Sequence, residues 1–208
     1  MSGDFGKTRW KYFVPILLSG LAATSLLAVG MAQQVMAASF LISNQKSKLS
    51  SDFLIAHGVA QYGLVDVTWD GAHIPVAVAS FRHAVFRNLC QSLVLPLGPL
   101  GRYTLKITAG RGAHPATAEN ISTDALSSKT DRTTYHGFDG GIAAGAITKG
   151  MVNPGDAHSP YFDPGSSAQQ ADTLIQKNVR TIAVATSAET FDLPGMALTL
   201  KRNGPECF

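Results

Sequence analysis

A long uncharged segment near the start of the chain constrains this sequence most. Lys7, Arg9 and Lys11 precede an apolar run at 13–32, and no charged residue follows until Lys46. A helix of about 20 residues, rising about 1.5 Å per residue, spans the roughly 30 Å hydrocarbon layer of a bilayer. Because the basic residues stand on one side only, the positive-inside rule places the N-terminus in the cytoplasm.

A secretory signal peptide has a similar pattern, although its apolar region is usually about 7–15 residues long. The small residues before Ala38 fit a signal-peptidase site, so the bond between Ala37 and Ala38 is the candidate cleavage site. A helix buried in a cytosolic core is the third alternative, but such a helix seldom lacks every charge. The sequence predicts a cytoplasmic tail at 1–12, an anchor or signal peptide at 13–37, and an extracytoplasmic domain at 38–208. That domain is either held at the membrane by a single span or secreted after cleavage.

The composition limits the partners that we expect. Of the 208 residues, 45% are hydrophobic and only 15% are charged, which argues against disorder. No basic stripe interleaves with aromatic residues, so no nucleic-acid partner is predicted. The expected partners are membrane lipid, through the N-terminal helix, and another membrane or envelope protein.

Short alternating runs separated by turn signals predict an all-β extracytoplasmic domain. We expect strands at 73–81, 102–108, 180–186 and 197–201, with two more at 51–63 and 64–69. Pro75 suits an edge strand or the entry of a strand.

The arrangement of these strands stays open between a sandwich, a roll and an irregular β-solenoid. Asn88, Asn120 and Asn178 are each followed by an apolar residue, and a parallel solenoid can place Asn at repeated corners. The spacings are unequal, at 32 residues (88 to 120) and 58 residues (120 to 178), which argues against a regular solenoid.

Residues 137–170 are rich in glycine and proline and predict a long loop that covers one end of the β-structure. Within this loop, Asp156, His158 and Asp163 are candidate metal ligands. The other histidines are scattered, without the spacing of a zinc site, so neither a metal nor another cofactor is predicted.

Cys90 and Cys207 are the only cysteines, and both fall in the expected exported part. Thiols outside the cytoplasm tend to pair, so a disulfide between them is the leading interpretation. Two unpaired buried thiols are the main alternative, since neither cysteine has the Cys-x-x-Cys context of a reactive thiol.

No catalytic residues emerge from the sequence, which lacks the G-x-S-x-G elbow of serine hydrolases. The favoured interpretation is a non-enzymatic envelope protein with a structural role or a role in binding a ligand or partner. The alternative is a secreted esterase or lipase-like hydrolase.

Several short motifs together carry a family resemblance. They are Lys-Thr-Arg-Trp-Lys at 7–11, Met-Ala-Ala-Ser-Phe at 36–40, Asn-Leu-Cys-Gln-Ser at 88–92 and the terminal Glu-Cys-Phe at 206–208. The chain resembles, over nearly its whole length, a family of uncharacterised actinobacterial exported membrane proteins that are sometimes labelled cholesterol esterase. The resemblance implies a membrane location and two recurring cysteines that match Cys90 and Cys207. It implies no catalytic residues, and this sequence has no serine elbow to support the esterase label.

Overall fold

A computed structural model describes residues 45–208, which are mostly β-strand. The expected anchor or signal peptide and the candidate cleavage bond between Ala37 and Ala38 lie outside these residues. Within the described range, no helix has the length and hydropathy needed to cross a bilayer. The prediction of an all-β domain is confirmed.

The elements follow one another in an order dominated by strands. The strands are β1 (Ser47–Val67), β2 (His73–Arg87), β3 (Leu89–Pro96), β4 (Arg102–Ala109), β5 (Ala116–Lys129), β6 (Arg132–His136), β7 (Asp139–Ala143), β8 (Ser167–Ser187), β9 (Thr190–Asp192) and β10 (Ala197–Arg202). Three helical turns interrupt them: η1 (Gly98–Leu100), η2 (Ala144–Ala146) and α2 (Pro154–Ala157). The strand expected at 51–63 and residues 64–67 of the strand expected at 64–69 are therefore parts of one strand, β1, and Trp69 lies in the turn that follows.

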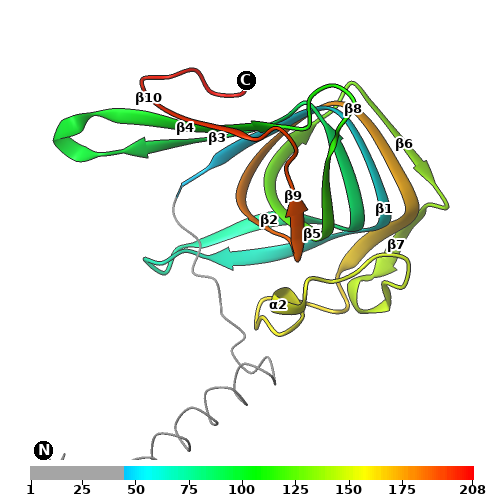
Figure 1. Ribbon diagram of the computed structural model, residues 1–208. Helices are drawn as coiled ribbons and strands as arrows, with labels where there is room; N and C mark the ends of the chain where they lie inside the picture. Colours follow the sequence, from blue (N-terminus) through cyan, green and yellow to red (C-terminus); the bar gives the residue numbers. More distant parts are fainter. Residues whose placement is uncertain (1–44) are drawn as a thin grey trace, which may run out of the picture. The chain divides into compact units, whose positions relative to one another are not determined.

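The four longest strands close the sheet on itself (Figure 1). β1 pairs with β2 along one edge and with β8 along the other, and β5 pairs with both β2 and β8. We call this arrangement the four-strand ring. All pairings between the described strands are antiparallel, which differs from the parallel rungs of a solenoid. Pro75 stands at the strand entry, before β2 begins its pairing with β5 at Ala77.

The strands of the ring are bent where single residues adopt a left-handed backbone. Gly58 in β1, Asn120 in β5 and Asn178 in β8 have φ of 64°, 47° and 52°. Side chains in a regular strand point to one face at every second position. Across the bend at Asn120, Ala118 and Ile121 lie three positions apart and both join the same core. The bends therefore shift the alternation that a sequence pattern relies on.

Asparagine recurs in this chain because it tolerates the left-handed conformation and finds a polar partner there. Three such asparagines each donate their side-chain amide to a carboxylate: Asn88 to Asp52 (2.6 Å), Asn120 to Glu189 (2.5 Å) and Asn178 to Asp131 (2.6 Å). The recurrence noted in the sequence marks bends within β5 and β8 and the junction between β2 and β3, and not the corners of a solenoid.

Two apolar clusters hold the domain together. The first includes Leu54, Val59, Phe81, Phe86, Ile121 and Leu174, which come from all four strands of the ring. The second includes Tyr62, Leu64, Val76, Val78 and Val184. Against it pack Ile142 of β7 and, from the segment between β7 and β8, Ile147, Val152 and Phe162. The expected loop at 137–170 is therefore a packed cover, and its last four residues belong to β8.

Close backbone contacts attach this cover to the ring. The buried side-chain oxygen of Gln170 accepts hydrogen bonds from the amides of Thr148 (2.8 Å) and Lys149 (2.9 Å). The Arg82 guanidinium donates to the carbonyl of Gly150 at 2.7 Å. A Cβ at Gly150 would lie 2.5 Å from the carbonyl carbon of Val59, so only glycine permits this approach.

β3, β4 and β10 form a three-stranded extension that projects from the ring (Figure 1). The C-terminal tail, residues 203–208, covers one face of it. Cys207 is bonded to Cys90 on β3, as predicted, with the two Cα atoms 5.8 Å apart. The Cys207 amide donates to Ser92 Oγ (3.0 Å), and Thr104 Oγ1 donates to the Gly204 carbonyl (2.8 Å).

The disulfide generates a stability prediction. It links residues 117 positions apart, and closing so long a loop restricts the unfolded chain. We expect Cys90→Ser combined with Cys207→Ser to lower the free energy of unfolding by about 2–5 kcal/mol. Chemical denaturation followed by circular dichroism measures this change, and the unsubstituted chain under reductant is the control. Equal stability of the oxidised and reduced chains would contradict the prediction.

The bend at Asn178 generates a second stability prediction. We expect Asn178→Ala to be less stable than Asn178→Gly by about 1–2 kcal/mol, because alanine pays the steric cost of positive φ and glycine does not. Both variants lose the hydrogen bond to Asp131, so the difference between their denaturation midpoints isolates the backbone. Equal midpoints would show that the bend relaxes at no cost.

Candidate functional site

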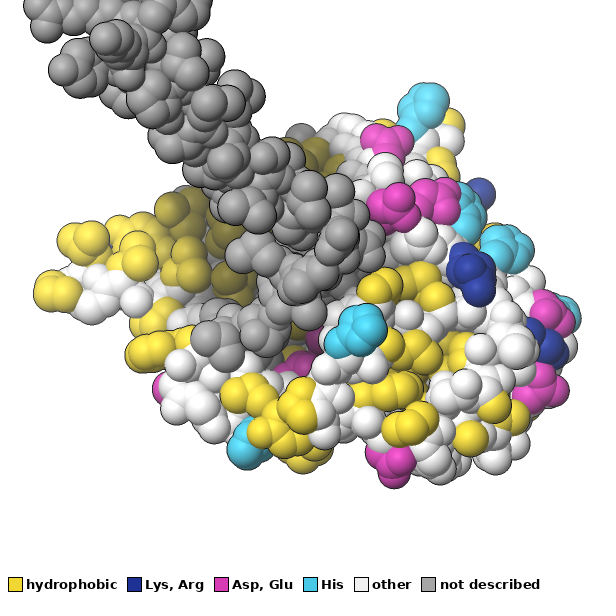
Figure 2. Space-filling view, turned by 90° about the horizontal axis from the view of Figure 1, so that it is seen from below, with side chains coloured by type: hydrophobic (Ala, Val, Ile, Leu, Met, Phe, Trp, Pro, Cys, Tyr) yellow, Lys and Arg dark blue, Asp and Glu magenta, His cyan; other side chains and the backbone are white. Residues whose placement is uncertain are grey.

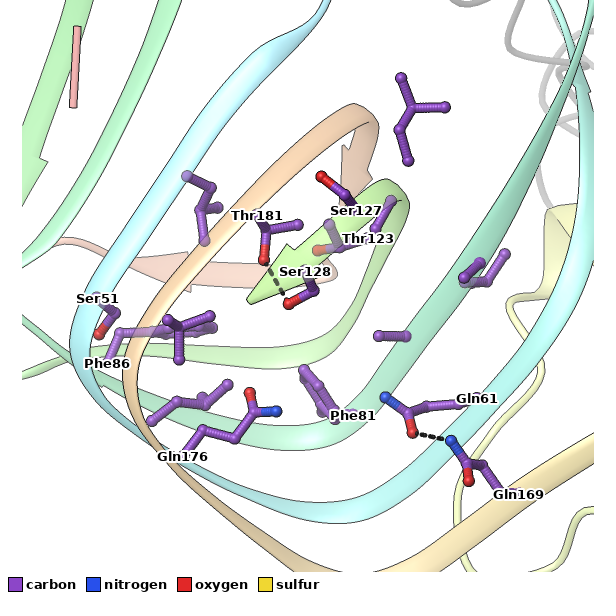
Figure 3. A pocket seen from close by; sticks show the side chains of 18 residues that line it. Ser51, Gln61, Phe81, Phe86, Thr123, Ser127, Ser128, Gln169, Gln176 and Thr181 are labelled. Atoms are coloured by element: carbon purple, nitrogen blue, oxygen red, sulfur yellow. Dashed lines mark hydrogen bonds between the residues drawn. The ribbon is translucent and has the colours of Figure 1, made fainter. Parts of the chain in front are cut away.

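A cavity of about 200 Å³ lies inside the four-strand ring and is the strongest candidate for a functional site. Side chains from all four strands line it (Figure 3). The apolar lining comes from Leu49, Leu54, Ala77, Val78, Ala79, Phe81, Phe86, Ala125, Leu126 and Val179, and the polar lining from Ser51, Gln61, Thr123, Ser127, Ser128, Gln169, Gln176 and Thr181. The interior is therefore mainly apolar, with separate groups that form hydrogen bonds.

The bend at Asn178 contributes to this space. The lining residues Gln176 and Val179 lie three positions apart in β8, on either side of Asn178. A regular alternation would turn one of them out of the ring. The bend keeps both inward, and small side chains such as Ala77 and Ala79 also line the cavity.

One end of the cavity is lined by two glutamines, and a tyrosine that does not line the cavity bonds to one of them. Gln61 and Gln169 point toward one another across the β1–β8 pair (Figure 3), and the Gln169 amide donates to Gln61 Oε1 at 2.7 Å. The hydroxyl of Tyr135, on β6, donates to the same oxygen at 3.1 Å. Burial raises the pKa of the Tyr135 phenol, and the hydrogen bond to Gln61 opposes that shift. The Gln61 oxygen thus has two donors already.

The cavity reaches solvent beside the end of β5, where the exposed Ser127 and Ser128 line it. Gln61, Ala77 and Gln169 also line a shallower hollow of about 270 Å³ outside the ring. The glutamine pair therefore separates the interior from this outer hollow. At the opening beside β5, Ser128 Oγ and Thr181 Oγ1 share a hydrogen bond of 3.0 Å.

The expected metal candidates do not form one site. Asp156 is buried on α2 and accepts a hydrogen bond of 2.7 Å from the Tyr62 hydroxyl. His158 and Asp163 are exposed, and Asp163 accepts from the amide of Gly165 at 2.8 Å in a local turn. Within residues 45–208, no three His, Cys, Asp or Glu side chains are placed to hold a metal ion.

Sequence reasoning missed a group of buried carboxyls near Asp156. Asp66 and Asp124 are each more than nine-tenths buried, and one oxygen of each lacks a hydrogen-bond partner. Burial, together with the charge of Asp156, raises the pKa of Asp66 to about 6. Burial, together with the charges of Asp66 and Asp156, raises the pKa of Asp124 to about 8. No signal in the strand pattern distinguishes these aspartates from solvent-facing ones.

The acidic group predicts how stability depends on pH. An aspartate in an unfolded chain has a pKa of about 3.9, so the folded protein binds more protons at Asp66 and Asp124 than the unfolded chain does. The contribution of these two groups to the free energy of unfolding is therefore highest below about pH 4, and it falls as the pH rises through 6 and 8.

We expect Asp124→Asn to remove much of the stability loss between about pH 5 and pH 9, an effect on the order of 2–4 kcal/mol. Denaturant titrations at several pH values measure it, and Asp163→Asn, at an exposed aspartate, is the matched control. The same pH slope in the Asp124 variant and the original chain would contradict the assignment.

The comparisons with known proteins identify a family but no activity. No curated protein and no solved structure matches the chain. Residues 43–208 match the model of a family of unknown function, DUF6230, and this range covers every described strand. The chain therefore belongs to the DUF6230 family, whose function is unknown.

Proposed function

We propose that this protein is a non-enzymatic binding protein of the cell envelope that holds a small, mainly apolar molecule inside the four-strand ring. The observation that carries the proposal is the cavity, which combines an apolar wall with hydrogen-bonding groups. Small-molecule sites have this composition, because apolar surface supplies the affinity and a few polar groups fix the orientation.

The size of the cavity limits the ligand. An apolar protein cavity of about 150 Å³ holds a benzene molecule. The 200 Å³ available here therefore suits a single aromatic ring with a substituent, or a short acyl chain. Ser128 and Thr181 offer hydroxyl groups that can bind a hydroxyl or carboxyl group of such a ligand.

Two features support an extracytoplasmic location. The Cys90–Cys207 disulfide is of a kind that persists in oxidising compartments. The uncharged run at 13–32 behind a basic collar supports a membrane anchor or a signal peptide. With the family resemblance, these features support an actinobacterial envelope protein, either anchored by one span or secreted after cleavage at Ala37.

The serines of the cavity favour binding over hydrolysis. Nucleophilic hydrolysis needs a serine beside a general base. Ser51 Oγ instead bonds to the backbone carbonyls of Phe53 (2.8 Å) and Arg87 (2.7 Å), and Ser128 Oγ bonds to Thr181. No histidine, aspartate or glutamate is among the residues that line this cavity in the described part of the chain.

Calorimetric titration of the full-length protein with indole and with hexanoate tests the proposal. We expect at least one of them to bind, and we expect Ala79→Leu to abolish binding because the larger side chain fills the cavity. Ala113→Leu, at an exposed position in the β4–β5 connection, is the control and should bind like the original chain.

Absence of binding by both probes, or unchanged binding by the Ala79 variant, would contradict the proposal. Turnover of a short-chain p-nitrophenyl ester that is lost in the same variant would instead assign the cavity to an esterase.

A further inference from the structure

The two faces of the three-stranded extension differ sharply. The C-terminal tail covers the face that carries Cys90, Ser92 and Thr104. Residues that stand directly opposite one another in the register point to the same face of the sheet, so the register also identifies the side chains on the other face. That face carries Leu93, Leu95, Tyr103, Leu105, Ile107, Leu198 and Leu200. The described residues place no comparable cover over it.

Large apolar side chains are exposed on and around this face. Leu198 and Leu200 are 55% and 51% exposed, although both lie in a regular strand. At the tip of the extension, Leu97 and Leu100 are 42% and 64% exposed. Figure 2 shows hydrophobic side chains gathered on the projecting part of the domain. A contiguous apolar patch of this kind marks a surface that meets a partner or a membrane.

The charges of the extension are all of one sign. Arg102, Lys106, Lys201 and Arg202 lie on its strands, while β3, η1, β4 and β10 contain no aspartate or glutamate. Arg102, Lys201 and Arg202 are exposed. By the same register, Arg202 lies on the apolar face opposite Tyr103, whereas Arg102, Lys106 and Lys201 lie on the face that the tail covers. There Lys106 Nζ donates to the Glu206 carbonyl at 3.2 Å. An apolar surface that carries Arg202, with the exposed Arg102 beside its tip, complements a bilayer with anionic headgroups, since the apolar groups enter the interface and the cations remain among the phosphates.

A second copy of this chain fits the surface less well. β10 is the outer strand of the sheet, and Lys201 and Arg202 on it disfavour pairing with another edge. Two such faces brought together would also oppose their Arg202 side chains, whereas an anionic bilayer attracts them.

Two further observations point in the same direction. The β1–β2 hairpin projects on the same side of the domain as the extension (Figure 1), and its turn carries Trp69, 70% exposed. Tryptophan is enriched where proteins meet the headgroup layer. β1 begins at Ser47, directly after Lys46, and Ser47 lies opposite Leu93 of the extension. The chain thus enters the described domain beside this face.

We propose that the apolar face and tip of the β3–β4–β10 extension dock onto the surface of an anionic phospholipid bilayer. The contact holds the folded domain against the membrane through its own side chains, whether or not the N-terminal segment remains attached. The inference does not depend on the ligand of the cavity, because none of the extension's exposed leucines lines that cavity.

A fluorescent label at the tip tests the proposal in the full-length chain. Cys90 and Cys207 are bonded to each other, so an added cysteine is the only free thiol. We would label Leu100→Cys with an environment-sensitive dye and, as the matched control, Thr134→Cys on β6, which is exposed on the opposite side of the ring. Each protein is mixed with vesicles of phosphatidylcholine alone or of equal parts phosphatidylcholine and phosphatidylglycerol.

We expect the Leu100 label to gain emission several-fold with a blue shift on the anionic vesicles, and to be quenched by spin-labelled acyl chains. The Thr134 label should change little. Leu198→Ser combined with Leu200→Ser should reduce the response of the Leu100 label several-fold while the disulfide still forms, as shown by mobility on non-reducing gels.

Three outcomes would overturn the proposal. The first is no response of the Leu100 label, and the second is an equal response of both labels, which would mean that no particular face docks. The third is a blue shift that grows with protein concentration without vesicles, which would assign the face to self-association.

Discussion

The pairing between β1 and β8 is the contact on which the rest of the domain depends. It runs from Ser47 opposite Ala183 to Gln61 opposite Gln169, and it joins strands that are more than a hundred residues apart in the chain. Without it, β2 and β5 would still connect β1 to β8, but the sheet would stay open. Closure gives the ring an inside, and thereby creates the main apolar cluster and the cavity. A sheet of bent antiparallel strands can enclose a small space only when both of its long edges are satisfied in this way.

The left-handed residues are the second constraint, and they explain how one sheet serves two cores. Gly58, Asn120 and Asn178 bend the ring and change which positions face inward. Beyond these bends, outward positions such as Tyr62 and Leu64 become apolar and are covered by the segment between β7 and β8. The same outer face holds Asp66 and Asp124, and Asp156 lies on α2 of the cover, so the packing of the cover against the ring buries three carboxyls. Its packing therefore makes the stability of the whole domain depend on pH.

The disulfide connects the extension to the domain's C-terminus in a way that bears on both proposals. The tail fastened by Cys207 occupies one face of β3 and β4, and Phe208 at its end lies beside the charged groups of Lys48 (5.4 Å from the ring centre) and Arg180 (6.0 Å). The extension therefore keeps one polar, covered face and one apolar, uncovered face. The cavity lies within the ring and the apolar face lies on the projection, so ligand binding and membrane docking would use separate surfaces of one rigid scaffold.

Local sequence determined the class of structure, because alternation, turn residues and the scarcity of helical periodicity act over a few residues. It also indicated the Cys90–Cys207 bond, since only two cysteines are present. It did not reveal β5, where Asn120 interrupts the alternation, nor that a single strand runs from Ser47 to Val67. The cavity, the Gln61–Gln169 contact and the buried Asp66 and Asp124 came only from tertiary structure. Each depends on which residues of distant strands stand opposite one another, and that register is set by the closure of the sheet and not by any residue's near neighbours.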